Sequence, residues 1–170
     1  SEAQRILTAQ KDVQGQAKKL YEHITKRQAK KLYSVSEKIG EGGYGKVYTA
    51  KCKDRKLQPE RVAIKVMRHD ETDAKAQRTN LRELLYLNKL KHPNIVELYR
   101  AHLVEEEELL LVLEYMEGGT LREASKVTVF DEDEVAFCAR EILQAVAFMH
   151  ENGCVHRDIK SHNVMMTVEG

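Results

Sequence analysis

Three polar residues that could take part in phosphoryl transfer lie within six positions near the end of the sequence. Asp158, Lys160 and Asn163 follow a long segment with an apolar stripe and precede a short strand predicted at the apolar residues 164–166. Phosphoryl transfer needs an acceptor for the hydroxyl proton, a cation for the moving phosphate and an oxygen ligand for magnesium. An Asp, a Lys and an Asn meet these needs in turn. Because a polar loop could contain the same residues by chance, their significance depends on the residues that precede them.

A glycine cluster at residues 40–45 is a second feature suited to phosphate. Gly40, Gly42 and Gly45 match the pattern GxGxxG, which also serves dinucleotide-binding folds, where the glycines open a helix. Here the β-branched and aromatic residues 46–50 follow, which predicts a hairpin that acts as a lid. Glycines allow backbone N–H groups to approach phosphate oxygens where side chains would collide. A plain glycine-rich hairpin turn is the alternative for this loop considered by itself.

A third feature is a lysine at the end of an apolar strand. Lys65 ends the run Val-Ala-Ile-Lys, and burying an ammonium without a partner is costly. The two candidate partners are a nucleotide phosphate and Glu83, which borders the apolar stripe of the next helix. The alternative is that Lys65 extends to solvent and that Glu83 is an ordinary charge on the helix surface.

The elements that must position these residues predict an α+β fold. Short connections between consecutive strands favour an antiparallel sheet, with one helix at residues 72–90 inserted after the third strand. We interpret the acidic residues 105–108 as a solvated hairpin tip. The five predicted strands are residues 33–39, 47–50, 61–67, 95–104 and 109–115.

Helices follow the predicted sheet. A short helix is expected near Leu121, and a long helix is expected to open at Asp131, with Glu134 at the spacing of a capping box. Asn152 and Gly153 end the long helix. Its predicted buried stripe comprises Val135, Cys138, Ala139, Ile142, Val146 and Met149.

Residues 1–32 differ from the rest of the sequence because they are rich in lysine and poor in acidic residues. They are predicted to form a basic, helical N-terminal extension, with apolar residues at three- and four-residue spacing. A regulatory or membrane-surface helix is one interpretation. A solvated basic linker with helical tendency is favoured, because charge runs usually lie in water. The stripe comprises Ile6, Val13, Ala17, Leu20, Tyr21 and Ile24.

The composition is that of an ordinary globular domain. The 170 residues are 42% hydrophobic and 32% charged, with a net charge of +1, which does not indicate nucleic-acid binding. Three scattered cysteines form no CxxC pair, and no apolar run could span a bilayer, so a cytoplasmic protein with reduced thiols is expected. The sequence lacks an initiator Met, and both ends are expected to continue into a longer protein.

Taken together, the glycine loop, the Val-Ala-Ile-Lys run, Glu83 and the run His-Arg-Asp-Ile-Lys-Ser-His-Asn resemble the eukaryotic protein kinase family over residues 33–170. Asp158 followed by Lys160 resembles the serine/threonine pattern. Residues 47–50, 113–119 and 156–161 are most similar to the Sterile-20 group and, within it, to the GTPase-activated branch. The resemblance implies a five-stranded antiparallel small lobe with one inserted helix, followed by the start of a helical large lobe.

The resemblance also implies catalytic roles and the cofactors ATP and Mg²⁺. Lys65, held by Glu83, would bind the α- and β-phosphates. Asp158 would be the catalytic base, Lys160 the cation at the γ-phosphate and Asn163 a magnesium ligand.

Further residues are implied to bind ATP. The loop would cover the phosphates, Leu113 would guard the back pocket, and the backbone of Glu114 and Met116 would bond the adenine edge. The full set is Ile39, Gly40, Glu41, Gly42, Gly43, Tyr44, Gly45, Lys46, Val47, Ala63, Lys65, Leu113, Glu114, Met116 and Met165.

Three neighbours of the catalytic residues are also interpreted through the family. Arg157 resembles the arginine that senses a phosphorylated activation loop, and Ser161 often helps to place the acceptor. His162 stands where an acid is frequent in the nearest group, and we interpret it as a tolerated change on the solvent side.

The family pattern also requires Asp-Phe-Gly soon after Val164, and the 170 residues do not contain it. The leading hypothesis is that the parent protein phosphorylates serine or threonine hydroxyls of proteins, with a small GTPase or an upstream kinase as activator. The fragment itself is expected to be inactive. A nucleotide-binding pseudokinase and a scaffold that docks a partner through its basic segment are the alternatives.

Overall fold

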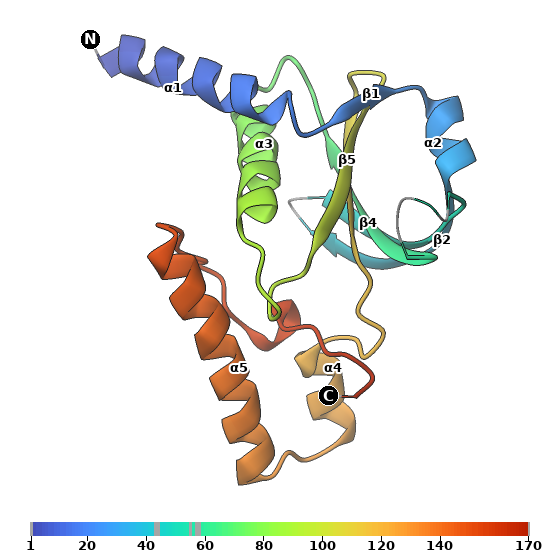
Figure 1. The fold of residues 1–170 in the computed structure, drawn as a ribbon, viewed down its shortest axis with the longest axis vertical. Helices are drawn as coiled ribbons and strands as arrows, with labels where there is room; N and C mark the ends of the chain where they lie inside the picture. Colours follow the sequence, from blue (N-terminus) through green and yellow to red (C-terminus); the bar gives the residue numbers. More distant parts are fainter. Residues whose placement is uncertain (1, 43–44, 55, 57–58, 170) are drawn as a thin grey trace. The chain divides into compact units, whose positions relative to one another are not determined.

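The computed structural model describes residues 2–42, 45–54, 56 and 59–169 of the chain. The chain divides into two compact units, whose elements are labelled in Figure 1. We call Ser1–Lys89 with Glu97–Tyr115 the sheet unit, and Leu90–Val96 with Met116–Gly170 the helical unit. The polypeptide passes between the units after residues 89, 96 and 115.

The sheet has one strand more than the sequence predicts. Strands β2 to β6 pair antiparallel with their neighbours as expected, and the α+β class is confirmed. The additional strand, β1, pairs in parallel with β5, so the sheet is mixed. Three residues inside a basic stretch are too few to show alternation, and this is why the sequence did not reveal β1. In sheet order the strands are β1 (Glu22–Ile24), β5 (Leu98–Val104), β6 (Glu108–Glu114), β4 (Arg61–Arg68), β3 (Gly45–Cys52) and β2 (Tyr33–Gly42).

Alternation along β4 separates two hydrophobic clusters on the two faces of the sheet. Ile64 is buried in one cluster, while Met67 is buried in the other, together with Leu81 and Leu84 of helix α3 (Ala74–Lys89). Successive side chains of a strand point to opposite faces, so Lys65 projects from the same face as Met67. Helix α3 therefore covers the face of the sheet that carries Lys65.

The N-terminal residues are built into the sheet unit. They form α1 (Glu2–Ala17), β1 and α2 (Lys26–Leu32), and Ala17 is fully buried in the cluster that contains Leu84. The favoured interpretation of a solvated linker is wrong for the stripe from Val13 to Ile24, while the side chain of Ile6 lies outside the described residues. The lysines of the segment are indeed exposed, but the apolar side chains between them find partners within the unit.

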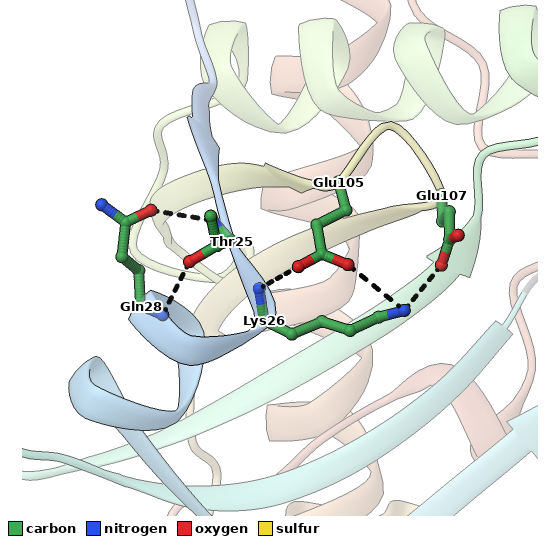
Figure 2. A network of polar contacts seen from close by, with 5 residues as sticks. All are labelled: Thr25, Lys26, Gln28, Glu105 and Glu107. Carbon is green, nitrogen blue, oxygen red and sulfur yellow. Dashed lines mark hydrogen bonds and ion pairs between the residues drawn. The ribbon is translucent and has the colours of Figure 1, made fainter.

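The acidic tip between β5 and β6 is also not simply solvated. Glu105 and Glu107 contact Lys26, as Figure 2 shows, and Glu106 contacts His23 with Nδ1 and Oε1 2.5 Å apart. The three glutamates hold the start of α2 and the strand before it. The run of acids was interpreted as solvent-facing because its basic partners lie about 80 residues away in sequence.

Two capped helices dominate the helical unit, α4 (Leu121–Val127) and α5 (Glu132–Glu151). The predicted capping box at the start of α5 is confirmed: Glu134 N–H donates to Asp131 Oδ1 at 2.8 Å, and the Glu134 carboxylate accepts from Asp131 N–H at 2.9 Å. Asn152 caps the other end, and Gly153 follows with a φ of 70°.

The buried stripe predicted for α5 is wrong over its first turns. Val135 is 54% exposed, and Ala145 is the one residue of α5 that is buried in the described part of the chain. The described residues of the helical unit offer few apolar partners to the stripe. No helix in the described ranges is both long enough and apolar enough to cross a membrane.

Candidate active site

One set of predicted residues lies in the sheet unit and contains the ion pair between Lys65 and Glu83. Lys65 Nζ lies 2.6 Å from Glu83 Oε1 and donates a hydrogen bond to it. The side chains are 18% and 30% exposed, so the pair is largely but not completely removed from water. Removing one partner of such a pair leaves the other with an uncompensated charge in a partly dry site. The ammonium is therefore fixed in position next to Glu83 and does not extend into solvent.

Strand register places further candidate residues on the face that carries Lys65. Val47 of β3 is directly opposite Lys65, and Leu113 of β6 is directly opposite Ala63. Residues directly opposite each other project to the same side, and Ala63 is two positions from Lys65, so all four share one face. Gly40 is in turn opposite Val47. The sheet unit thus gathers apolar side chains beside one ammonium, a surface suited to a flat ring with an anionic tail.

The glycine loop joins β2 to β3. Gly43 and Tyr44 lie outside the described residues, while Gly42 and Gly45 are opposite each other at the end of the hairpin. Gly45 has a φ of 134°, and a Cβ there would lie 2.5 Å from the carbonyl oxygen of Val66, so the fold itself requires glycine. At Gly42 a Cβ would meet nothing within 4 Å. The described residues therefore do not require glycine at this position, and its role in phosphate binding stays a prediction.

Glu41 is the acidic residue of this loop, and two lysines offset its charge. Lys38 donates a hydrogen bond to its carboxylate, and Lys46 Nζ lies 3.8 Å from its other oxygen. The hydrogen bond from Lys38, followed by the charge of Lys38, lowers the pKa of Glu41. The pairing reduces the repulsion that a free carboxylate would exert on phosphates. Ile39, expected to pack on adenine, is 43% exposed and has room for a partner.

The expected adenine-edge residues lie where the chain leaves the sheet unit. Glu114 ends β6, and its N–H donates to the carbonyl of Glu97 at 2.9 Å, so the carbonyl of Glu114 is its group suited to accept from a base. Met116 begins the next segment of the helical unit, and its carbonyl accepts from Gly119 N–H at 3.3 Å. This leaves the N–H of Met116 as its candidate group for adenine.

A second set of predicted residues forms a compact polar cluster in the helical unit. The amide of Asn163 donates to the carbonyl of Asp158 at 2.9 Å and to its Oδ2 at 3.1 Å. Lys160 Nζ lies 3.3 Å from Asp158 Oδ1, and Asp158 N–H donates to His156 Nδ1 at 3.1 Å. The Asp158 carboxylate is 59% exposed, so it can reach a substrate while its own loop fixes its direction. The amide oxygen of Asn163 is the atom suited to ligate a cation.

The residues around this cluster show how the loop is shaped. Arg157 has a φ of 69°, an uncommon conformation for a residue with a side chain, directly before Asp158. Ser161, His162 and Asn163 form a short 3-10 helix, in which His162 is exposed, in agreement with a solvent-side position.

The strand predicted at residues 164–166 is wrong. The segment forms one isolated bridge, between Met165 and Thr120, because its neighbour at Gly118 and Gly119 is a turn and not a strand. Met165 is nevertheless half-buried and held in place by that bridge.

The structure therefore brings together the predicted residues within each unit. Lys65, Glu83, Val47, Ala63 and Leu113 share one side of the sheet unit, and the catalytic-loop residues contact one another. No group of three or more His, Cys, Asp or Glu that could hold a metal occurs among the described residues, and the role of Asn163 as a magnesium ligand stays a prediction.

One feature beside the site was not predicted: α1 packs against α3, the helix that carries Glu83. The apolar stripe around Ala17 was the available sequence signal, but a stripe does not identify the surface that it contacts.

Comparison with known proteins agrees with this geometry. The family described as "Protein kinase domain" matches residues 33–170. "Probable serine/threonine-protein kinase mkcB" of Dictyostelium discoideum is 44% identical over 153 residues, 89% of this chain and 21% of that protein. "Probable serine/threonine-protein kinase mkcC" of the same organism is 47% identical over 86% of this chain and 16% of its own length. "Serine/threonine-protein kinase PAK 1" of Mus musculus is 40% identical over 83% of this chain and 25% of that protein. The chain thus spans a quarter or less of the length of these relatives.

Proposed function

The chain belongs to the protein kinase domain family, and we propose on this basis that the protein containing it transfers the γ-phosphoryl group of ATP to serine or threonine hydroxyls of proteins. The observation that carries the proposal is the 2.6 Å ion pair between Lys65 and Glu83, on the face shared with Val47 and Ala63. The Asp158-x-Lys160 pattern and the printed names of the three relatives support serine and threonine as acceptors.

We assign the binding step to the sheet unit. When bound, ATP supplies the phosphoryl group, and Mg²⁺ offsets the charge of its phosphates. Lys65, oriented by Glu83, binds the α- and β-phosphate oxygens. Backbone N–H groups at the glycine loop approach the phosphates, because Gly42 leaves the space that a side chain would fill. Val47 would pack on the adenine from above, with Ala63 beside it, because both side chains project from the face that carries Lys65.

We assign the proton and charge transfer to the loop of the helical unit. Asp158 accepts a hydrogen bond from the substrate hydroxyl and takes its proton as the phosphoryl group moves. Lys160 places a positive charge beside that group, and Asn163 offers its amide oxygen to the cation. The two bonds from Asn163 to Asp158 keep the carboxylate in a fixed direction, which reduces the reorganisation needed during the reaction.

The protein substrate, the activator and the location are parts of the same proposal. The acceptor is a protein serine or threonine, and the resemblance to the GTPase-activated Sterile-20 branch favours a small GTPase or an upstream kinase as activator. Cys52, Cys138 and Cys154 form no disulfide in the described part of the chain, which supports a cytoplasmic protein.

The test is Asp158→Asn in the whole protein that contains these residues. Asparagine keeps the shape but cannot take the proton, so kcat should fall by roughly 10²–10⁴-fold while ATP affinity changes little. His162→Asn is the matched control, because His162 is exposed in the same loop and has no assigned role. If Asp158→Asn keeps near-full turnover, or if its loss follows a fall in melting temperature, the catalytic-base assignment fails. Nucleotide binding without turnover in the wild type would favour the pseudokinase alternative.

A further inference from the structure

Helix α3 carries Glu83 and packs on two partners: Leu81 and Leu84 share one buried cluster with residues of the sheet, such as Met67, and with Ala17 of α1. Figure 1 shows α1 lying across α3. Ala17, at the end of α1, is fully buried in the same cluster as Leu81 and Leu84 of α3. Leu84 directly follows Glu83, so the side chains that α1 covers belong to the same turn of α3 as the glutamate.

Further contacts extend this packing on both sides of Ala17. Val13, Leu20 and Tyr21 pack against the same cluster, and Gln14 Nε2 donates to Gln77 Oε1 of α3 at 3.3 Å. The last turn of α1, from Val13 to Ala17, thus faces α3, and Leu20 and Tyr21 continue the packing beyond the end of the helix. Small Ala17 permits the close approach of the two helices, since a larger side chain would need volume that the cluster does not have.

The segment that follows α1 is fixed to the edge of the sheet beside β5. Strand β1 pairs with residues 102–104 of β5. Lys26 N–H donates to Glu105 Oε1 at 3.0 Å, and Lys26 Nζ lies 2.8 Å from Glu107 Oε2 and 3.4 Å from Glu105 Oε2. The backbone bond from Lys26 is the largest cause of a lowered pKa at Glu105. Thr25 and Gln28 close a capping box around the same turn (Figure 2).

We propose that residues 13–28 act as an intramolecular brace that holds α3 so that Glu83 remains paired with Lys65, with Ala17 as a positioning residue. Its residues 22–28 contact the hairpin of β5 and β6, and its apolar side chains around Ala17 pack against α3. Because α1 supplies part of the packing of α3, α3 can shift on the sheet when α1 leaves, and the partly exposed Glu83 carboxylate would then separate from Lys65. This inference rests on the proposed function, because it assigns the brace to the reaction of Lys65.

The test compares Ala17→Glu with Gln16→Glu in the whole protein. Both variants add one negative charge to α1, but position 17 is buried against α3 and position 16 is exposed. Ala17→Glu should lower kcat by roughly 10-fold, an ordinary coupling between two sites, with little change in KM for the protein substrate. Gln16→Glu should have the activity of the wild type. Equal activity of Ala17→Glu and the wild type would overturn the brace.

A double variant separates positioning from simple loss of stability. If Ala17 acts through Glu83, then Ala17→Glu should cause no further loss of kcat in a Glu83→Gln background. If Ala17→Glu lowers kcat by the same factor in the Glu83→Gln background as in the wild type, Ala17 has only a structural role, and the proposal is overturned. Should Ala17→Glu fail to fold, Lys26→Met removes the anchor from the surface, and it should lower kcat in the same direction by a smaller factor. An unchanged kcat in Lys26→Met would then count against the brace.

Hydrogen exchange keeps the test independent of activity. Amides of residues 74–89 should exchange faster in Ala17→Glu than in Gln16→Glu, while those of β3 and β4 should not change. If the wild type proves inactive, the proposed function fails, and the exchange result still decides whether α1 holds α3. Unchanged exchange in α3 would overturn the brace whatever the activity.

Discussion

Lys65 and Glu83 are 18 residues apart and meet because a strand and a helix pack on each other, whereas Asp158, Lys160 and Asn163 lie within six residues and bond mainly to their own loop. The first pair is largely buried, and the second group is mostly exposed. The sheet unit therefore depends on its whole core to form its part of the site, while the loop of the helical unit depends on local hydrogen bonds. Mutations that disturb the packing of the sheet unit far from Lys65 should consequently change the position of its side chain. The position of the Asp158 side chain should change only when its neighbours in the loop are mutated.

The largest effect should come from Lys65→Met in the whole protein. Methionine has a similar volume but cannot join the phosphates to Glu83, so kcat/KM should fall by at least about 10²-fold. The fold should persist, because Glu83 is partly exposed and can turn to water. Phosphate transfer assays, ATP titration and circular dichroism measure these outcomes, with Lys65→Arg as the variant that keeps the charge. Unchanged turnover together with unchanged ATP affinity would show that Lys65 is only a strand-end lysine.

A smaller effect, on stability alone, should distinguish two glycines of one loop. Gly45→Ala forces a side chain into a left-handed conformation and against the carbonyl of Val66, so it should destabilise the sheet unit by about 1–3 kcal/mol. Gly42→Ala meets open space, so it should leave the denaturation midpoint unchanged but weaken ATP binding. Urea denaturation and nucleotide titration of both variants test the contrast. A stable Gly45→Ala, or a Gly42→Ala with normal ATP affinity, would remove the distinction between the glycine required by the fold and the glycine required by the ligand.

The smallest effect should be a loss of stability of the sheet unit in mild acid. Burial lowers the pKa of His102, against the opposing effect of Glu22, and burial also lowers the pKa of His69. A lowered pKa means that the unfolded chain binds more protons near and below the ordinary value of about 6.5. The stabilising contribution is therefore complete above that pH and is lost as the pH falls through the lowered values.

Urea midpoints at pH 7.5 and 5.5 measure this loss. The midpoint should be lower at pH 5.5, and the difference should shrink in His102→Gln, which keeps an acceptor near the Tyr33 hydroxyl, 2.8 Å from His102 Nε2. Equal midpoints at the two pH values in the wild type would contradict the prediction.

Local patterns predicted the parts of the molecule that local forces determine. The capping box of Asp131 and Glu134 and the alternation of residues 61–67 both depend on a few neighbouring residues, and both were predicted correctly. The pairing of Lys65 with Glu83 was one of two alternatives open to the sequence, and the packing of α3 selected it.

The features that the sequence did not predict depend on distant partners. Strand β1 forms because it pairs with the backbone of β5. The glutamates at residues 105–107 have partners because Lys26 and His23 contact them. The stripe of α5 has the periodicity of a buried face, yet burial requires a partner surface that the described helical unit does not supply at Val135. Periodicity identifies the side of an element that is apolar, but not what covers it.

The parallel pairing of β1 with residues 102–104 also bears on how the protein behaves in concentrated solution. An uncovered strand at the edge of a sheet presents a row of N–H and C=O groups that can recruit a strand from another molecule. Without β1, the edge of this sheet would be β5, whose residues 101–104 are buried and largely apolar. Strand β1 covers that edge, and the lysines of α2 follow directly after it. Residues 22–32 therefore protect the sheet unit from self-association, and their deletion would expose a template for aggregation.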